Sequence, residues 1–179
     1  MQDTRKLLAD GFTRIAEAVP QVLDGLSSED IEWQPAPTAN SIGWLVWHLA
    51  RVEDDHLTNL ANALGRTGSR PFCAQVWRSG RWNAKMQLPY GDHHGYGHTP
   101  EQVAQFHLED PGLLIAYYAA VHKQTLGVLK WVKSRDYRVV IDTRWTPPVT
   151  GGVRIVSVLN DVTQHIGQAA YIKGLLEAR

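Results

Sequence analysis

Cysteine is nearly absent from this 179-residue chain, in which Cys73 stands alone. A single cysteine excludes an internal disulfide and a zinc site built from several thiolates. Nothing beside Cys73 in the sequence would stabilise a thiolate, so we interpret this residue as a small apolar packing group rather than a reactive thiol.

An excess of charge and a long apolar run are also missing. Lys+Arg and Asp+Glu are both 18, whereas nucleic-acid binders usually carry a basic excess on one surface. No run approaches the roughly 18 apolar residues of a membrane span, and the first residues, MQDTRKLLADGF, lack the apolar segment of a signal peptide. We therefore expect a cytoplasmic protein with a small-molecule substrate, and we expect it to bind neither nucleic acid nor membrane.

Four long amphipathic stretches dominate what the sequence does contain. Apolar residues recur at three- and four-residue steps over residues 4–23, 40–63, 112–133 and 153–178, and few strand signals accompany them. Pro20 is expected to kink or end the first helix, and Gly65 to end the second. With 44% hydrophobic residues, the chain should form a single domain over 1–179, an all-α four-helix bundle with two long crossover loops.

The segments between these helices carry turn and cap signals. Ser27 or Ser28 can cap a short helical turn, and residues 138–141 could form a short strand. Residues 65–98 hold six glycines and several aromatic residues, which predicts a long loop that packs on the bundle. Thr99 and Gln102 form a capping-box pattern, so a helix should start there and be interrupted at Pro111 and Gly112. The seven tryptophans are interpreted as packing residues unless they flank a site.

The last helix places an acid and an imidazole in its inner line. At about 100° per residue, one narrow stripe contains Val158, Asp161, His165, Ala169, Ile172 and Leu176. A buried charge costs several kcal/mol unless it is paired or bound to a cation. Ligands at positions i and i+4 of one helix are also how helical metal sites are built. A hydrogen-bonded Asp–His pair with a purely structural role is the alternative.

His48 supplies a third candidate ligand from the second helix. A metal site in a bundle core needs ligands from facing helices, and this histidine lies on a helix face with Trp44, Leu45 and Val52. The set His48, Asp161 and His165 offers nitrogen and oxygen donors suited to zinc, nickel or another divalent ion. Three protein ligands leave one coordination position open, as in a catalytic site.

Other polar residues receive simpler interpretations. His56 lies two helical turns, about 12 Å, beyond the histidine of the second helix, too far to share its ion, and Asp55 should be solvated or salt-bridged. His93 and His94 are interpreted as exposed loop residues. Gln168 follows the last-helix histidine by three residues and should hydrogen-bond to it or to a substrate.

Three segments resemble the DinB-like superfamily, in particular the branch that contains mycothiol-dependent maleylpyruvate isomerase. They are SIGWLVWHLARVEDDHL (41–57), GYGHTPEQV (95–103) and LNDVTQHIGQAAYIKGLL (159–176). The resemblance implies a four-helix bundle with up-down-down-up connections and a divalent metal held by three side chains, which fall on His48, Asp161 and His165. Relatives commonly have His or Glu where Asp161 stands, and because aspartate is shorter, its reach depends on the spacing of the helices.

Three functions are compatible with this set of residues. The first is a metal-dependent thiol transferase or thiol-dependent isomerase, which would use a low-molecular-weight thiol such as mycothiol, with residues 65–98 covering the site. The second is a metal-assisted hydrolase, which the neutral Gln168 and the lack of a glutamate base disfavour. The third is a non-catalytic metal-binding bundle. Aromatic seams on the helices are also compatible with a homodimer.

Overall fold

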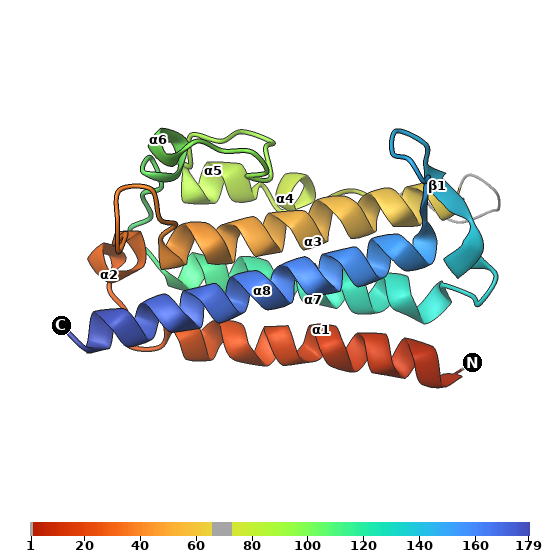
Figure 1. Cartoon of the computed structure of the whole chain (residues 1–179), viewed down its shortest axis with the longest axis horizontal. Coiled ribbons are helices and arrows are strands. Elements are labelled where there is room, and N and C mark those ends of the chain that lie inside the picture. The colour runs from red at the N-terminus through yellow and green to blue at the C-terminus, as the bar shows by residue number, and fades with distance from the viewer. Residues whose placement is uncertain (1, 66–72) are drawn as a thin grey trace.

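Four long helices lie side by side in the computed structural model, which describes residues 2–65 and 73–179 (Figure 1). They are α1 (Gln2–Leu23), α3 (Ile42–Gly65), α7 (Gly112–Trp131) and α8 (Gly151–Glu177). Helices α1 and α8 run in one direction and α3 and α7 in the other. Contacts join α1 to α7, α7 to α3, α3 to α8 and α8 to α1, which closes the ring. The predicted all-α four-helix bundle is thereby confirmed, with up-down-down-up connections.

The helix ends lie within about two residues of the predicted ones. The first helix ends at Leu23, as predicted, with Pro20 inside its last turn. Proline removes one backbone hydrogen bond, but Val22 and Leu23 are both buried, and their burial keeps the last turn on the bundle. The last helix begins at Gly151, because the Thr150 side chain accepts a hydrogen bond from the Val153 N–H and caps the first turn.

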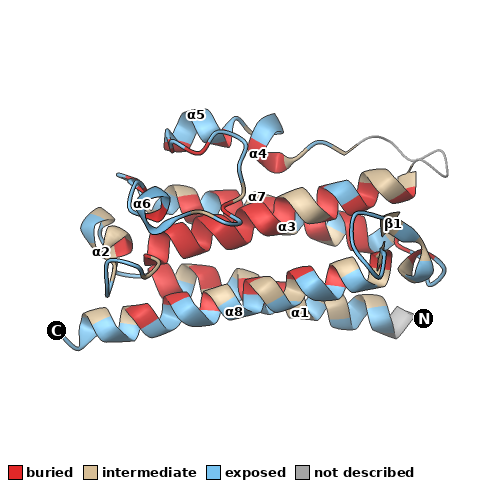
Figure 2. Cartoon of the chain, turned by 45° about the horizontal axis from the view of Figure 1, so that its top comes forward, coloured by how far each residue is buried: buried red, intermediate tan, exposed pale blue. Residues whose placement is uncertain are grey.

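Helix α3 is the central element of the core. Figure 2 shows buried residues along most of its length, whereas α1 and α8 are buried along one side only. Leu45, Trp47, Leu49 and Leu60 of α3 are fully buried. Helix α3 contacts both α7 and α8, and the segment that follows it in the chain packs over it. A polar side chain on most faces of α3 therefore meets protein rather than water.

That segment contains the short helices α4 (Val76–Ser79), α5 (Trp82–Met86) and α6 (Pro100–Val103). It packs on the bundle as predicted, since Trp77, Trp82 and Tyr90 are buried. Residues 66–72 of the predicted loop lie outside the described residues.

The helix predicted from Thr99 is much shorter than expected. The capping box between Thr99 and Gln102 is present, but the helix ends at Val103 instead of reaching Pro111. Phe106 and Leu108 are buried, and the Leu108 N–H donates to the Glu32 carboxylate at 3.0 Å. This contact takes the backbone donor that a continuing helix would use, so the prediction of a longer helix was wrong.

The remaining connections bring short elements to the ends of the bundle. Helix α2 (Ser28–Glu32) is capped by Ser27, as predicted. The strand expected at 138–141 is displaced to β1 (Val140–Asp142), which pairs antiparallel with β2 (Val149–Thr150), because residues 136–138 form a 3-10 turn. Within the part of the chain that the structure describes, the helices lack the length and apolar character needed to cross a membrane.

Candidate metal centre

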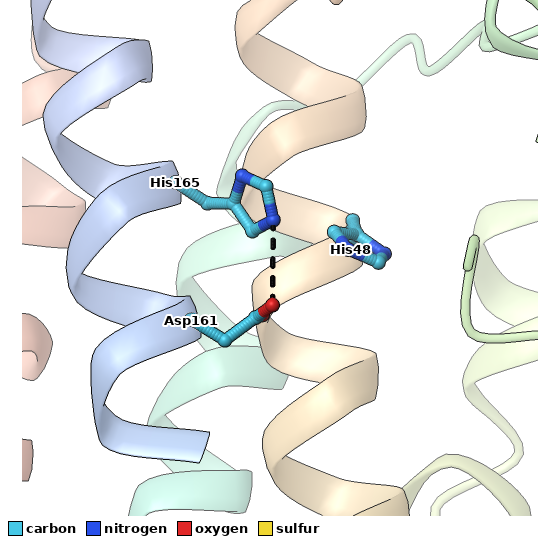
Figure 3. A group of neighbouring side chains, drawn as sticks. All are labelled: His48, Asp161 and His165. Carbon is cyan, nitrogen blue, oxygen red and sulfur yellow. Dashed lines mark ion pairs between the residues drawn. The ribbon is translucent and has the colours of Figure 1, made fainter. Parts of the chain in front are cut away.

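Three side chains from two helices converge between α3 and α8 (Figure 3). His48 belongs to α3, and Asp161 and His165 belong to α8, so the predicted set is brought together. One possible ligand atom of each lies within 4.8 Å of the others. The His165 Nε2 and the nearer Asp161 oxygen are 3.7 Å apart, beyond hydrogen-bond length. The geometry therefore differs from that of the hydrogen-bonded structural pair considered above.

The expectation that Asp161 and His165 are buried was wrong. The buried line of α8 contains Val158, Val162 and Ile166, whereas the side chains of Asp161 and His165 are 38% and 19% exposed. Val162 directly follows Asp161, and Ile166 directly follows His165, so the two polar residues lie at the edge of the buried face of α8. Two of the three side chains are consequently partly accessible to solvent.

Two contacts, a ring stack and a hydrogen bond, fix the orientation of the His48 imidazole. Trp44 stacks on the imidazole, with ring centroids 4.7 Å apart and planes 14° from parallel. The Nδ1–H donates to the carbonyl oxygen of His94, which leaves the lone pair of Nε2 free for a ligand. Burial lowers the pKa of His48 to about 3. The ring is therefore neutral, the form in which histidine binds metals.

His165 has the same arrangement on the facing helix. Its Nδ1–H donates to Oε1 of Gln168 at 2.8 Å, the contact predicted for Gln168. Nε2 therefore faces Asp161. Fixing one ring nitrogen by a hydrogen bond while the other is left as a ligand is the common state of metal-binding histidines.

Asp161 has an oxygen whose hydrogen bonding is incomplete. Its Oδ2 is buried and has no hydrogen-bond partner among the described residues, a condition that costs free energy unless a cation or water satisfies it. Ligand atoms about 2.1 Å from one zinc ion lie within about 4.2 Å of one another. A small side-chain rotation brings the observed set into that range, so these residues fit a divalent cation.

A glycine allows the backbone to approach the first histidine closely. Gly95 has a φ of +92°, and a Cβ placed on it would lie 2.5 Å from Nδ1 of His48. The neighbouring His94 is half-buried and supplies the carbonyl that orients His48. The interpretation of His94 as an exposed loop residue was therefore wrong, although the side chain of His93 is exposed as expected.

Buried charges on α3 hold this loop in place, and sequence reasoning did not single them out. The guanidinium of Arg51 is completely buried and donates to the carbonyl of Asp92 at 2.8 Å and to that of His93 at 3.2 Å. The carboxylate of Asp54 accepts from the N–H groups of Val76 and Trp77, both at 2.8 Å. The available signal was the run RVEDD inside an apolar helix, which places charges where the helix meets protein.

The same run contains a second buried acid, which faces α7. Glu53 is fully buried and accepts from the hydroxyls of Thr125 at 2.6 Å and Tyr118 at 2.8 Å. Burial raises the pKa of Glu53 to about 7. These contacts tie α3 to α7, away from the cluster with the two histidines.

The other candidate residues behave largely as expected. Nδ1 of His56 lies 3.2 Å from Oδ2 of Asp55, and both residues lie outside the three-residue cluster. Cys73 is half-buried, and burial raises the pKa of its thiol. The unreactive interpretation of Cys73 agrees with this environment.

Comparisons with known proteins add a family and a fold. The chain matches the model of the family described as mycothiol-S-transferase over residues 7–178. It is similar to a crystal structure described as the conserved protein of a locus from Enterococcus faecalis, with 32% sequence identity, a TM-score of 0.84, and coverage of 97% of each chain. No curated protein matches the chain.

Proposed function

We propose that this chain, which belongs to the mycothiol S-transferase family of the DinB-like superfamily, is a divalent-metal-dependent enzyme that joins the sulfur of a low-molecular-weight thiol to an electrophilic small molecule. The observation that carries the proposal is the convergence of His48, Asp161 and His165 between two helices, with Asp161 and His165 partly exposed. Both histidines use Nδ1 for a hydrogen bond and turn Nε2 to the cluster.

The charge of this donor set suits a thiol substrate. Two neutral imidazoles and one carboxylate carry a formal charge of −1, so a divalent cation leaves +1 at the site. Bound there, such a cation would lower the pKa of a nearby thiol, as it does for water and for cysteine. The two imidazole donors favour zinc or nickel over magnesium or calcium, which prefer all-oxygen sites.

The surrounding residues prepare the site for this chemistry. Trp44 covers the face of His48 and keeps water from it, while the exposed side of Asp161 and His165 lets the thiol and its partner enter. The thiol proton leaves to solvent, and a sulfur lone pair forms the new S–C bond. The leaving group departs with its bonding pair, or an activated double bond takes up a proton instead.

Metal content and thiol consumption test the proposal together. Purified protein should contain one divalent ion per chain by elemental analysis, and His48→Ala and His165→Ala should lose it. His107→Ala is the matched control, because this histidine is 69% exposed and pairs with Glu32 outside the cluster. The metal-loaded protein should conjugate mycothiol to a model alkyl halide faster than the metal-free protein.

Two results would overturn the proposal. One is stoichiometric metal that survives both histidine substitutions, which would place the ion elsewhere. The other is equal rates with and without metal. Ester or amide cleavage that needs metal but gains nothing from added thiol would assign the site to a hydrolase instead.

A further inference from the structure

A cavity of about 800 Å³ lies between the second half of α3, the β1–β2 hairpin and the start of α8. The hairpin contacts both helices at the end of the bundle where α3 finishes and α8 begins (Figure 1). A smaller hollow of about 420 Å³ shares part of this lining and is formed by His56, His94, Tyr96, Arg144, Trp145 and Arg154. None of the three cluster residues lines either space, so this region is distinct from the candidate metal centre.

Two arginines of the hollow, Arg144 and Arg154, share one carboxylate and are called the arginine pair below. Arg144 donates to both oxygens of Asp142 at 2.9 Å, and Arg154 donates to one of them at 3.1 Å. Two guanidiniums and one carboxylate leave a formal charge of +1. The side chain of Asp142 is 8% exposed and that of Arg144 is 84% exposed, so the guanidinium is presented to solvent while the acid is covered.

The other charged residues of the larger cavity have partners of their own. Asp55 lies 3.2 Å from His56 and accepts from Gln75 at 2.7 Å. Arg78 forms an ion pair at 3.0 Å with Asp92, which lies outside the lining. Among the described residues that line the smaller hollow, two are arginines and none is an acid. The smaller hollow is therefore the part of this region that suits an anion.

Most N–H donors of the arginine pair remain available to a ligand. A guanidinium has five of them, and the contacts among the described residues use two of Arg144 and one of Arg154. The side chain of Arg154 is only 15% exposed, so bulk water satisfies few of its remaining donors. A planar carboxylate can accept two parallel N–H bonds from one guanidinium. Such a group would engage these donors and neutralise the surplus charge.

Two aromatic side chains border the same hollow. Tyr96 is 80% exposed and Trp145 is 57% exposed, although aromatic rings of this size are usually covered over much of their surface. A ligand with a flat apolar body and one acidic group would contact both kinds of residue. A small inorganic anion would leave the rings uncovered, and an uncharged apolar molecule would leave the arginine donors unpaired.

We propose that this hollow binds an aromatic carboxylate, with the carboxylate held by Arg144 and Arg154 and the ring covered by Tyr96 and Trp145. The volume of about 420 Å³ lies in the range of sites for small organic ligands. Binding here requires neither a metal ion nor a thiol, so the site is additional to the candidate metal centre.

Calorimetric titration of the purified protein with three probes tests the chemistry of the ligand. Naphthoate has both the rings and the carboxylate, naphthamide lacks the charge, and acetate lacks the rings. Naphthoate should bind, and each of the other two should bind at least about tenfold more weakly, since each loses one of the two kinds of contact.

Substitutions in the hollow test where naphthoate binds. Arg144→Gln and Arg154→Gln should each weaken its binding about tenfold, because charge-assisted hydrogen bonds are lost. Arg144 is largely exposed, so its variant tests the site even if Arg154→Gln reduces the stability of the fold. Trp145→Ala should weaken binding about threefold or more, since one aromatic contact is removed.

Two matched controls should bind naphthoate as the wild type does. Arg14→Gln removes a surface arginine that pairs with Asp10, and Tyr171→Ala removes an aromatic ring that is 69% exposed and lies outside the hollow. Three results would overturn the proposal: naphthoate fails to bind at millimolar concentration, naphthamide binds as tightly as naphthoate, or both arginine variants keep the wild-type affinity. The last result would place the carboxylate elsewhere, for example on a metal ion at the three-residue cluster.

Discussion

Replacing Gly95 by alanine should weaken metal binding without touching a ligand. A Cβ at this position would lie 2.5 Å from Nδ1 of His48 and 3.0 Å from the Trp47 ring, whereas ordinary contacts begin near 3.4 Å. His48 is stacked on Trp44 and cannot retreat. The loop must therefore move away by about an ångström, and the carbonyl of His94 moves with it, so that the hydrogen bond to Nδ1 is lost.

The substitution should have two effects, a loss of stability and a loss of metal affinity. The same substitution at Gly97 distinguishes them. Alanine at a positive φ costs about 1–2 kcal/mol of stability. This part applies equally to Gly97, whose φ is +75° and where an added Cβ would meet no atom within 4 Å. Loss of the hydrogen bond that orients a metal-binding histidine typically costs about 10–100-fold in metal affinity. This second part applies to Gly95 alone.

Competition with a chromophoric chelator measures zinc affinity, and thermal unfolding of the metal-free proteins measures stability. Gly95→Ala and Gly97→Ala should both melt earlier than the wild type, but only Gly95→Ala should lose at least about tenfold in zinc affinity. Equal zinc affinity in the two variants would refute the role assigned to the His94 carbonyl.

Three further predictions follow from the described contacts. Gln168→Ala removes the acceptor of the His165 Nδ1–H and should weaken zinc binding about tenfold, measured by the same competition; unchanged affinity would show that this contact does not orient the ring. The pKa of Glu53 is about 7 in the folded state against an ordinary value of 4.5. Between these pH values the native state holds a proton that the unfolded state has lost. The free energy of unfolding should therefore fall as pH rises from 4.5 to 7. Glu53→Gln should abolish that fall, on the order of 3 kcal/mol, in urea unfolding across this range, whereas Glu109→Gln at an exposed position should keep it. Asp54→Ala strands the buried Arg51 charge and should cost about 3–5 kcal/mol in urea unfolding; a loss below about 1 kcal/mol would contradict the importance of this pair.

Most of the helical framework could be predicted because its signals are local. Periodic apolar residues and a cap at Ser27 define elements without reference to the rest of the chain. The start of α8 shows where local signals mislead. Glycine is typical of loops, but Gly151 lies inside the helix, where a Cβ would be 2.5 Å from the carbonyl oxygen of Asp136. Close packing, which has no local signature, requires this glycine.

In the candidate site, the three side chains could be predicted from the sequence, but the backbone contact that orients one of them could not. Asp161 and His165 are neighbours on one helix, so spacing alone brings them together, and His48 follows from the need for a ligand on a facing helix. The carbonyl that orients His48 could not be predicted, since every residue has one and only the path of the loop selects that of His94. The exposure of Asp161 likewise depends on how α8 is rotated about its axis.

The buried Arg51–Asp54 pair connects the metal centre to Gln75 and Asp55. Burying two charges rarely adds stability by itself, and apolar replacements of similar volume are often neutral. This pair, however, binds backbone groups of a segment with little regular structure, and those groups need partners when they are buried. Arg51 also donates to Gln75 at 3.3 Å, and Gln75 donates to Asp55 at 2.7 Å. One set of α3 charges therefore fixes both the loop that orients His48 and the side chains of Gln75 and Asp55, so a substitution at Arg51 should disturb both regions together.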